Sequence, residues 1–343
     1  NLPEPTVVPS EHFNTVTYSS STSPLSITGV GFQPDLVWAK SRSTADWHAL
    51  VDVTRGTSNT VFSNDTNAEL NISSVTSFDT DGFTVGSNAT VNEQVSTQTY
   101  VAWNWKANGT GVSNTNGTIT STVSANADAG FSIVSYTGTG SSATVGHGLS
   151  KAPELIIAKN RGHSADWAVG GNVIGSWSDK TLELNNTVAT VTDSNIFGAD
   201  PTTSLFTIGT SWKTNRSGYN HIAYCFHSVE GYSKVGSYTG NGSTDGTFVY
   251  TGFRPALIIG KRVDSIEDWQ IIDTARGVYN VTDYRLNPNN SNAEVAGSGG
   301  GDRLDILSNG FKARDGAGQW NASGSTYIYL AFAENPFKYT NAR

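Results

Sequence analysis

The chain has 343 residues and a net charge of −8, from 21 basic and 29 acidic side chains. This length allows two or three domains, and the acidic balance argues against nucleic acid as a partner. No apolar run approaches the ~20 residues that insert into a membrane. Residues 1–5 are not typical of a signal peptide. The absence of methionine leaves open whether Asn1 follows processing or lies inside a longer chain.

One segment of the chain occurs three times, at residues 31–40, 148–159 and 252–261. Each copy runs from a glycine through a proline to a lysine, and an acidic residue followed by tryptophan comes shortly afterwards. Self-similarity at a long period indicates one supersecondary unit that is copied along the chain. Residues shared by all copies are therefore best explained by folding, and function is to be sought in what differs between copies.

Short β-branched and aromatic runs dominate each copy, as at residues 15–18, 131–136 and 235–238, and Gly, Asn, Asp and Ser interrupt them. Helical periodicity is hard to find. Strands at such spacing are typical of antiparallel sandwiches. The sequence predicts an all-β protein of three tandem antiparallel β-sandwich modules, jelly-roll or lectin-like, of roughly 100 residues each.

The three copies set the predicted domain boundaries. An N-terminal arm at residues 1–11 precedes a first module at 12–108. A segment at 109–129, rich in Gly, Ser, Thr and Asn, is either a flexible linker or an exposed hairpin. The second module spans 130–230 and the third spans 231–343.

Every module repeats a lysine, an aspartate and a tryptophan. A buried lysine needs a partner, because an uncompensated charge inside a protein costs several kcal/mol. We expect a structural lysine–aspartate pair beside a core tryptophan, rather than three copies of one active site. The residues concerned are Lys40, Asp46, Trp47, Lys159, Asp166, Trp167, Lys261, Asp268 and Trp269.

Two further motifs contain paired acidic or basic residues. An Asp-x-x-Arg-Gly loop at 52–56 and 273–277 predicts an ion pair that closes the loop, with ligand recognition by the arginine as the alternative. The second module has no such loop. Asp79 and Asp81 have the spacing of a small calcium loop but lack its further ligands, so we expect a plain Asp-Gly turn, with a metal site as the alternative.

Catalytic motifs are absent from the sequence. There is no nucleophile elbow, no zinc-protease helix and no P-loop, and the six histidines fall at unmatched places. Distant carboxylate pairs for glycoside cleavage stay open. The single cysteine, Cys225, excludes an internal disulfide and lies in an apolar run typical of a core. We expect a protein that is not an enzyme, with no catalytic residues and no cofactor.

Three tryptophans lie in polar, loop-like surroundings, and amides flank two of them. An exposed aromatic ring beside amides suits the apolar face and the hydroxyls of a sugar. The alternative is that each ring caps the end of its own sandwich. The candidate ligand-binding residues are Trp177, Trp212, Trp320, Asn215 and Asn321.

The repeated glycine, proline, lysine, Asp-Trp pattern and the ending at 326–337 resemble repeat modules in virion-surface proteins of tailed bacteriophages, especially marine ones. The resemblance covers residues 12–343. Copy three departs from it, because Lys261 and Arg262 are adjacent. Such proteins are described as tail-fibre, receptor-binding or structural proteins, and the resemblance implies no catalytic residue.

The resemblance and the composition together predict a function. We expect a non-enzymatic tail-fibre or appendage component on the virion surface that contacts host-surface glycan. Its expected partners are other virion proteins and further copies of itself, as a trimer if it is a fibre, with no nucleic acid and no membrane insertion. A capsid decoration protein without receptor binding and a bacterial cell-surface lectin or adhesin are the alternatives.

Overall fold

A computed structural model describes residues 7–94, 97–282, 284–295, 303–316 and 318–336. The chain is all-β, with 44% strand and 3% helix arranged in several antiparallel sheets, as the sequence predicted. Part of the predicted N-terminal arm, residues 1–6, and the end of the third predicted module, residues 337–343, lie outside the described residues. No helix in the described ranges is long and apolar enough to span a membrane.

The first third of the chain, here called repeat one, builds one large and one small sheet. The 3-10 helix η1 (Pro9–Glu11) comes first. The large sheet has the order β1 (Phe13–Ser19), β9 (Thr99–Trp105), β3 (Leu36–Ser41), β4 (Ala49–Asp52), β5 (Asn59–Phe62) and β6 (Leu70–Asn71). The small sheet has the order β2 (Leu25–Thr28), β8 (Gly82–Val85) and β7 (Val75–Asp79), and helix α1 (Ala89–Asn92) follows it in the chain.

Repeat two has the same plan with an extended large sheet. That sheet has the order β10 (Val112–Asn114), β11 (Ser121–Asn126), β12 (Phe131–Thr137), β19 (Asn220–Phe226), β14 (Leu155–Asn160), β15 (Ala168–Gly171), β16 (Lys180–Glu183) and β17 (Val191–Thr192). The small sheet pairs β13 (Ala143–Gly146) with β18 (Leu205–Ile208), and helix α2 (Trp212–Asn215) precedes β19.

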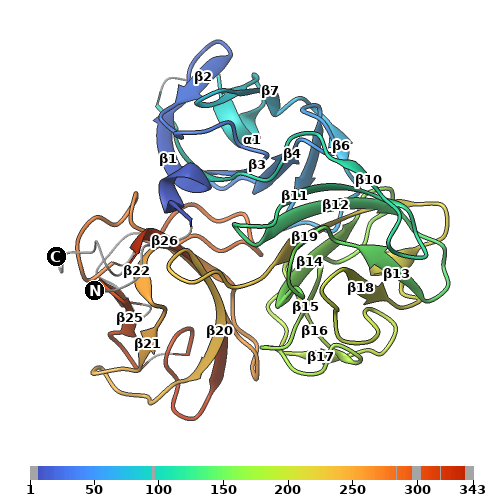
Figure 1. Ribbon diagram of the computed structural model, residues 1–343. Helices are drawn as coiled ribbons and strands as arrows, with labels where there is room; N and C mark the ends of the chain where they lie inside the picture. The colour runs from blue at the N-terminus through green and yellow to red at the C-terminus, as the bar shows by residue number, and fades with distance from the viewer. Residues whose placement is uncertain (1–6, 95–96, 283, 296–302, 317, 337–343) are drawn as a thin grey trace.

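Repeat three completes the set. Its large sheet has the order β20 (Ser233–Thr239), β26 (Thr326–Pro336), β22 (Phe253–Arg262) and β23 (Gln270–Asp273). Its small sheet has the order β21 (Phe248–Tyr250), β25 (Gly310–Ala313) and β24 (Leu304–Leu307). In Figure 1 the three repeats form three groups of strands around one centre, coloured blue, green and orange.

The strand that contains the repeated lysine is buried on both faces, as at Leu155–Asn160 in β14. Its apolar side chains face two ways because successive residues of a strand point to opposite sides. One side packs against the small sheet of its own repeat, as Val37 of β3 does with Phe83 of β8. The other side joins a core that all three repeats share.

Three aromatic residues mark the shared core. Trp105, Phe226 and Phe332 occupy equivalent places in β9, β19 and β26, opposite Leu36, Leu155 and Leu257 in the sheet register. The ring centroids of Trp105 and Phe332 are 5.7 Å apart, and those of Phe226 and Phe332 are 6.1 Å apart. The repeats therefore pack around a common centre and each also keeps its own outer core.

Each repeat also contacts the next through one loop, and the three contacts close a ring. The carbonyl of Thr66 in repeat one accepts from the amide of Ala165 in repeat two at 2.9 Å. The carbonyl of Thr187 accepts from Glu267 in repeat three at 3.0 Å, and that of Ser291 accepts from Asp46 in repeat one at 2.8 Å. The ring gives the chain an internal threefold arrangement.

The repeated lysines take part in these contacts, but the predicted lysine–aspartate pairs do not form among these side chains. Nζ of Lys159 donates to the carbonyls of Thr66 and Ala165 at 2.9 and 2.8 Å. Lys40 and Lys261 likewise bind backbone carbonyls. Burial lowers the pKa of each of the three lysines to about 8, and nearby carboxylates offset part of that effect. Carbonyl oxygens suffice as partners because a primary ammonium is a compact donor of three hydrogen bonds.

The aspartates of the three Asp-Trp pairs contact groups other than the repeated lysines. Asp46 accepts from the amide of Trp47 at 2.7 Å, and Asp268 accepts from the side chain of Asn289 at 2.6 Å. Asp166 lies 3.1 Å from Nζ of Lys213. These contacts hold loops in place where neighbouring repeats meet. The three aspartates therefore have a structural role.

The Asp-Trp pairs are not equivalent in space. Trp167 and Trp269 directly precede β15 and β23, are almost fully buried, and donate through Nε1 to carbonyls of the neighbouring repeat. Trp47 lies one residue earlier relative to β4 and is 36% exposed, whereas His48 takes the buried position. The prediction of three equivalent core tryptophans is therefore wrong at Trp47, because the pair is displaced by one residue in repeat one.

The Asp-x-x-Arg-Gly loops join neighbouring repeats. Asp52 accepts from Nε of Arg55 at 2.5 Å and from the hydroxyl of Tyr224 in repeat two at 2.8 Å. In the same way Asp273 accepts from Arg276 at 2.6 Å and from Nε1 of Trp103 in repeat one at 2.9 Å. The ion pairs are fully buried.

The structure gives a physical reason for the absence of the Asp-x-x-Arg-Gly loop from repeat two. Gly171 and Ile174 stand where the loop would place its aspartate and arginine, and Leu330 stands where Tyr224 and Trp103 stand in the other repeats. Because leucine offers no hydrogen-bonding group, a buried aspartate there would have no partner in the neighbouring repeat. The contact between repeats two and three is apolar at this place.

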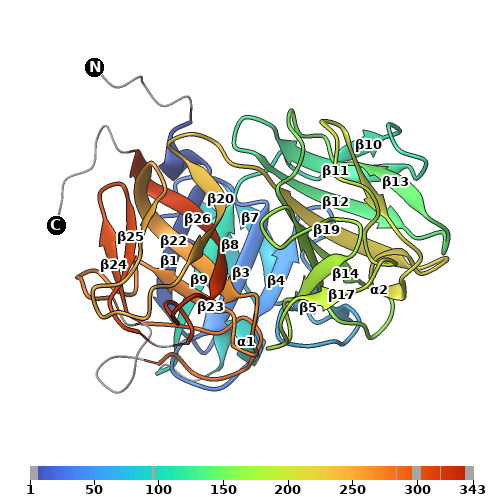
Figure 2. The same ribbon diagram turned by 90° about the horizontal axis from the view of Figure 1, so that it is seen from below.

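The segment at 109–129 contains a hairpin. Strands β10 and β11 pair with each other, and β11 extends the large sheet by pairing with β12. A bridge between Ile119 and Val145 brings the hairpin beside β13, as Figure 2 also shows. The extra residues of repeat two thus cover one edge of its small sheet.

Two buried histidines predict the response of the fold to acid. Burial lowers the pKa of His147 and of His221 to about 4. In the unfolded chain the same histidines bind a proton near pH 6.5. Their contribution to the free energy of unfolding is therefore fully present above pH 6.5 and is lost as the pH falls toward 4. We expect a loss of about 2 kcal/mol per histidine between pH 7 and pH 5.

Chemical unfolding at a series of pH values checks this expectation. The variant His221→Tyr carries the residue that repeats one and three have at this position, Tyr100 and Tyr327. Its stability should fall less steeply over the same range. If the free energy of unfolding of His221→Tyr fell as steeply with pH as that of the parent, His221 would not be a source of the acid sensitivity.

Candidate functional site

Two of the three candidate tryptophans are buried, so the structure corrects their assignment as exposed sugar contacts. Trp177 is 4% exposed and packs edge-on against Phe197, with ring centroids 5.6 Å apart. Gly170 leaves room for its ring, since a Cβ there would lie 2.7 Å from it. Trp320 is 1% exposed and lies over Gly260, where a Cβ would come within 2.4 Å of the ring.

The two candidate asparagines are also buried and hold loops together. Asn215 donates through Nδ2 to the carbonyls of Ser141 and Gly209 at 2.6 and 2.7 Å. Asn321 and Asn92 make the matching contacts in repeats three and one. A residue that serves the same purpose in every repeat, away from solvent, belongs to the scaffold, so neither candidate is available to a ligand.

Trp212 is different, since 52% of it is exposed. Its ring lies against that of His163, with centroids 5.3 Å apart. Cζ of Arg216 lies 5.8 Å from the centroid of Trp212 and 4.5 Å from that of Tyr219. His163 and Tyr219 are in turn in edge contact at 6.0 Å. We call these four residues the Trp212 cluster.

Local structure explains why Trp212 points outward. The side chain of Ser211 caps α2 by accepting from the amide of Lys213 at 3.3 Å, so Trp212 is the first helical residue. Lys213 points toward Asp166 and Glu183 and pairs with both. The helix thereby presents one polar side to the sheet and leaves the indole on the surface.

Asn160 links the loop that carries His163 to helix α2, which carries Trp212. Its buried Nδ2 donates to the carbonyl of Trp212 at 2.7 Å, and its Oδ1 accepts from the amides of Gly162 and His163 at 3.1 Å each. A Cβ at Gly162 would lie 2.7 Å from the ring of Tyr219, so the ring packs directly over this glycine. One buried amide thus sets the position of both aromatic loops.

The cluster belongs to repeat two alone. Asn92, Asn215 and Asn321 are equivalent, and the residue three positions before each is Ala89, Trp212 and Gly318. The residue that follows each asparagine is Glu93, Arg216 and Ala322, so the cation is equally specific to repeat two. By the criterion that function lies in what differs between copies, this is the leading candidate site.

The sequence indicated only Trp212 among these residues. His163, Arg216 and Tyr219 reach it from the loop after β14 and the loop after α2. The three residues are common in loops and have no motif of their own. An alignment of the three repeats could have shown that Arg216 occurs in repeat two alone. That alignment required the structure, which shows that Asn92, Asn215 and Asn321 are equivalent.

The candidate calcium loop is a turn with its carboxylates engaged. Asp81 accepts from the amides of Gly29 and Gly31 at 3.0 and 2.6 Å, which lowers its pKa. Asp79 accepts from the hydroxyl of Thr84 at 2.8 Å. In the described ranges, no group of three or more His, Cys, Asp or Glu side chains is placed to hold a metal ion.

The chemistry available at the Trp212 cluster is that of binding. Arg216 makes no ion pair with any described residue, so its guanidinium keeps its donors for a ligand. The indole of Trp212 and the phenol of Tyr219 lie beside it, and the imidazole of His163 contacts both of these rings. The only cysteine, Cys225, is fully buried, and burial raises the pKa of its thiol to about 12.

Comparison with known proteins gives one family. No curated protein and no solved structure matches the chain. A family model described as "Domain of unknown function (DUF7483)" matches residues 8–336 in one piece, which includes all three repeats and the ring that they close. The chain belongs to this family of domains of unknown function.

Proposed function

We propose that this chain is a non-enzymatic surface protein that binds glycan through the Trp212 cluster. The observation that carries the proposal is a half-exposed indole beside an unpaired arginine, present in repeat two and replaced by Ala89 and Gly318 in the other repeats. An indole face matches the apolar face of a sugar ring. The guanidinium supplies donors for hydroxyls and, in bidentate fashion, for a carboxylate.

The charge of the cluster favours saccharides that bear an acid group. Arg216 carries a charge with no counterion among the described residues, whereas Lys213 and Arg161 nearby are paired with Asp166, Glu183 and Glu69. A uronate or another acidic sugar would supply the missing partner. The proposed ligand class is therefore an acidic glycan of a cell surface.

The proposed location is the virion surface of a tailed bacteriophage, and it rests on the resemblance of the repeated motif. In this proposal the chain is a tail-fibre or appendage component, its partners are other virion proteins and further copies of the chain, and the glycan belongs to the host. A decoration protein without receptor binding is the competing proposal.

A matched pair of tryptophan variants tests the binding proposal. Trp212→Ala should weaken glycan binding at least about tenfold, since truncation of a central aromatic anchor is costly. The fold should be retained because half of the side chain is already in solvent. Trp47→Ala removes a similarly exposed indole from repeat one and should leave binding unchanged.

A glycan array that includes uronate-bearing oligosaccharides, followed by titration of the best ligand, gives the readout. Adsorption of the isolated protein to host and non-host cells gives a second one. Equal binding by Trp212→Ala and the parent, or no binding to any glycan or cell, would overturn the proposal. The position of the chain in a reconstruction of the particle separates a fibre from a decoration protein.

A further inference from the structure

His221 holds half of the Trp212 cluster through the backbone. Its Nε2 accepts from the amide of Arg216 at 3.3 Å. Nδ1 therefore carries the proton and donates to the carbonyl of Tyr219 at 2.9 Å. The imidazole is fully buried, so water does not compete for either bond. One neutral ring thus holds the guanidinium-bearing and the phenol-bearing residue of the cluster in place relative to each other.

Asn160 holds the other half of the cluster in the same manner. Its Nδ2 donates to the carbonyl of Trp212 at 2.7 Å, and its Oδ1 accepts from the amide of His163 at 3.1 Å. Asn160 is also fully buried and lies opposite His221 in the register of β14 and β19. Two neighbouring buried side chains therefore hold all four residues of the cluster.

The other repeats have a single tyrosine at this place. The hydroxyl of Tyr100 in repeat one donates to the carbonyl of Ala89 at 2.8 Å and accepts from the amide of Glu93 at 2.9 Å. The same two bonds form in repeat three around the hydroxyl of Tyr327. His221 has the equivalent position, and all three rings stack on the tyrosine opposite them in the sheet.

The exchange of tyrosine for histidine changes which groups the buried ring binds. An imidazole is shorter than a phenol, so His221 binds the amide and the carbonyl of Trp212 is bound by Asn160 instead. Repeats one and three have Ser41 and Arg262 in place of Asn160. Nδ1 has no counterpart in tyrosine and adds a bond to the following loop. The histidine and the asparagine therefore form one arrangement, and both are specific to repeat two.

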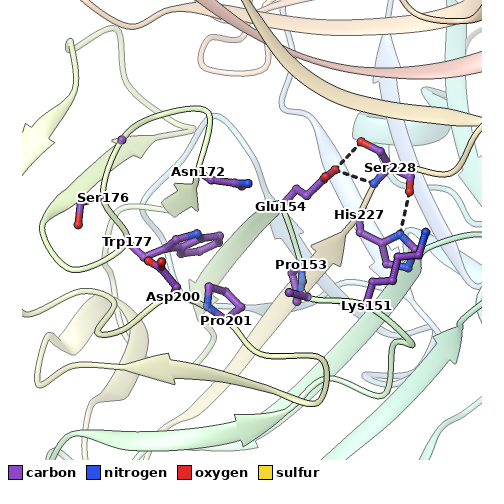
Figure 3. Close-up of a pocket in the computed structure, with 12 residues that line it drawn as sticks. Lys151, Pro153, Glu154, Asn172, Ser176, Trp177, Asp200, Pro201, His227 and Ser228 are labelled. Carbon is purple, nitrogen blue, oxygen red and sulfur yellow. Dashed lines mark hydrogen bonds between the residues drawn. The ribbon is translucent and has the colours of Figure 1, made fainter.

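A cavity of about 620 Å³ in repeat two lies apart from this arrangement, at the other end of β14. Figure 3 shows that Glu154 and His227, which line it, both bind Ser228. Trp177 also lines the cavity but is only 4% exposed. The described lining residues include no exposed aromatic ring and no member of the Trp212 cluster. The buried groups that bear on the cluster are thus those at its own end of β14.

We propose that His221 and Asn160 are the positioning residues of the glycan site. This inference rests on the function proposed for the Trp212 cluster. The two side chains divide between them the two bonds of a tyrosine hydroxyl and gain further bonds to His163 and Tyr219. Those bonds place an imidazole and a phenol beside the indole and the guanidinium. Because both side chains are fully buried, they act on a ligand only through the four residues of the cluster.

A double variant that copies repeat one tests the proposal. Asn160→Ser with His221→Tyr introduces the residues that repeat one has as Ser41 and Tyr100. A hydroxyl then replaces the two side chains as partner of the carbonyl of residue 212 and the amide of residue 216. We expect the variant to fold, because the loop is closed as in repeat one, and to lose the bond to Tyr219.

Two-dimensional NMR of the whole chain gives a readout that needs no ligand. The indole N–H signal that is missing from Trp212→Ala identifies Trp212, and we expect it to shift in the double variant. The signal that is missing from Trp47→Ala should stay in place. Tyr327→Phe removes the equivalent hydroxyl from repeat three and should leave the Trp212 signal unchanged. His221→Tyr alone should also shift that signal, and it replaces the double variant if the latter does not fold.

Titration with two acidic probes, trigalacturonate and a hyaluronan tetrasaccharide, gives the second readout. The double variant should bind on the order of tenfold more weakly than the parent, and Tyr327→Phe should bind equally well. An unmoved Trp212 signal, or a shifted signal with unchanged affinity, would overturn the proposal. A parent that binds neither probe would count against the proposed function instead. The indole signal would still decide whether the two residues position the cluster.

Discussion

Truncation of Trp167 to alanine should lower the free energy of unfolding by about 3–5 kcal/mol, whereas the same change at Trp47 should cost about 1 kcal/mol or less. Trp167 is fully buried, and its Nε1 donates to the carbonyl of Phe62 in repeat one at 2.8 Å. Trp47 is 36% exposed and rests on the ring of Phe62 at 4.7 Å. Truncation therefore leaves a cavity and removes one of the two donors to the carbonyl of Phe62 in one case, and leaves a shallow surface depression in the other.

Urea unfolding of the two variants under identical conditions measures the difference. The pair is a strict comparison because both tryptophans follow an aspartate and both contact Phe62. Equal losses would show that Trp47 is as deeply packed as Trp167. That result would contradict the one-residue displacement that places His48 in the core of repeat one.

Asp52→Ala should also be strongly destabilising at the contact between repeats one and two, with a loss of about 3–5 kcal/mol. It removes the carboxylate that pairs with Arg55 at 2.5 Å and accepts from Tyr224 at 2.8 Å. The arginine would remain inside with only part of its charge balanced, by Glu69 at 3.0 Å. A charge buried without its full partner costs far more than an ion pair lost at the surface.

A control and a compensating variant make this prediction specific. Asp179→Ala breaks the exposed pair with Lys180 and should cost less than about 1 kcal/mol. The triple variant Asp52→Gly, Arg55→Ile, Tyr224→Leu copies the apolar contact formed by Gly171, Ile174 and Leu330. It should be more stable than Asp52→Ala, because the buried guanidinium is removed together with its carboxylate and Glu69 keeps its pair with Arg161. A triple variant less stable than the single one would contradict this account of the contact.

Much of the local structure could be predicted from the sequence. The strands that begin near Pro34, Pro153 and Pro255 form where the repeated segment places them, because a short apolar run after a proline is typical of a strand covered on both faces. Asp81 lies in the turn between β7 and β8, as an Asp-Gly pair predicts, and two backbone amides of the same repeat, from Gly29 and Gly31, hold its carboxylate. Neither inference needed contacts between repeats.

The candidate site could be predicted only in part. Trp177, Trp212 and Trp320 have similar polar neighbours in the sequence, yet two are buried and one is exposed. The difference lies in Gly170 and Gly260, which lie on other strands and make room for the rings of Trp177 and Trp320. The polar neighbours of a tryptophan in the sequence do not report a space that a glycine of another strand creates.

The amino-acid sequence by itself determined that this protein is built from strands in three related copies, because alternation, turns and repetition are local properties of a chain. The tertiary structure alone decided that the copies close into a ring around Trp105, Phe226 and Phe332, and which copy-specific residues reach the surface. The physical reason is that closure depends on carbonyls, ion pairs and aromatic rings contributed by different repeats. Those contacts form only when segments a hundred residues apart pack together.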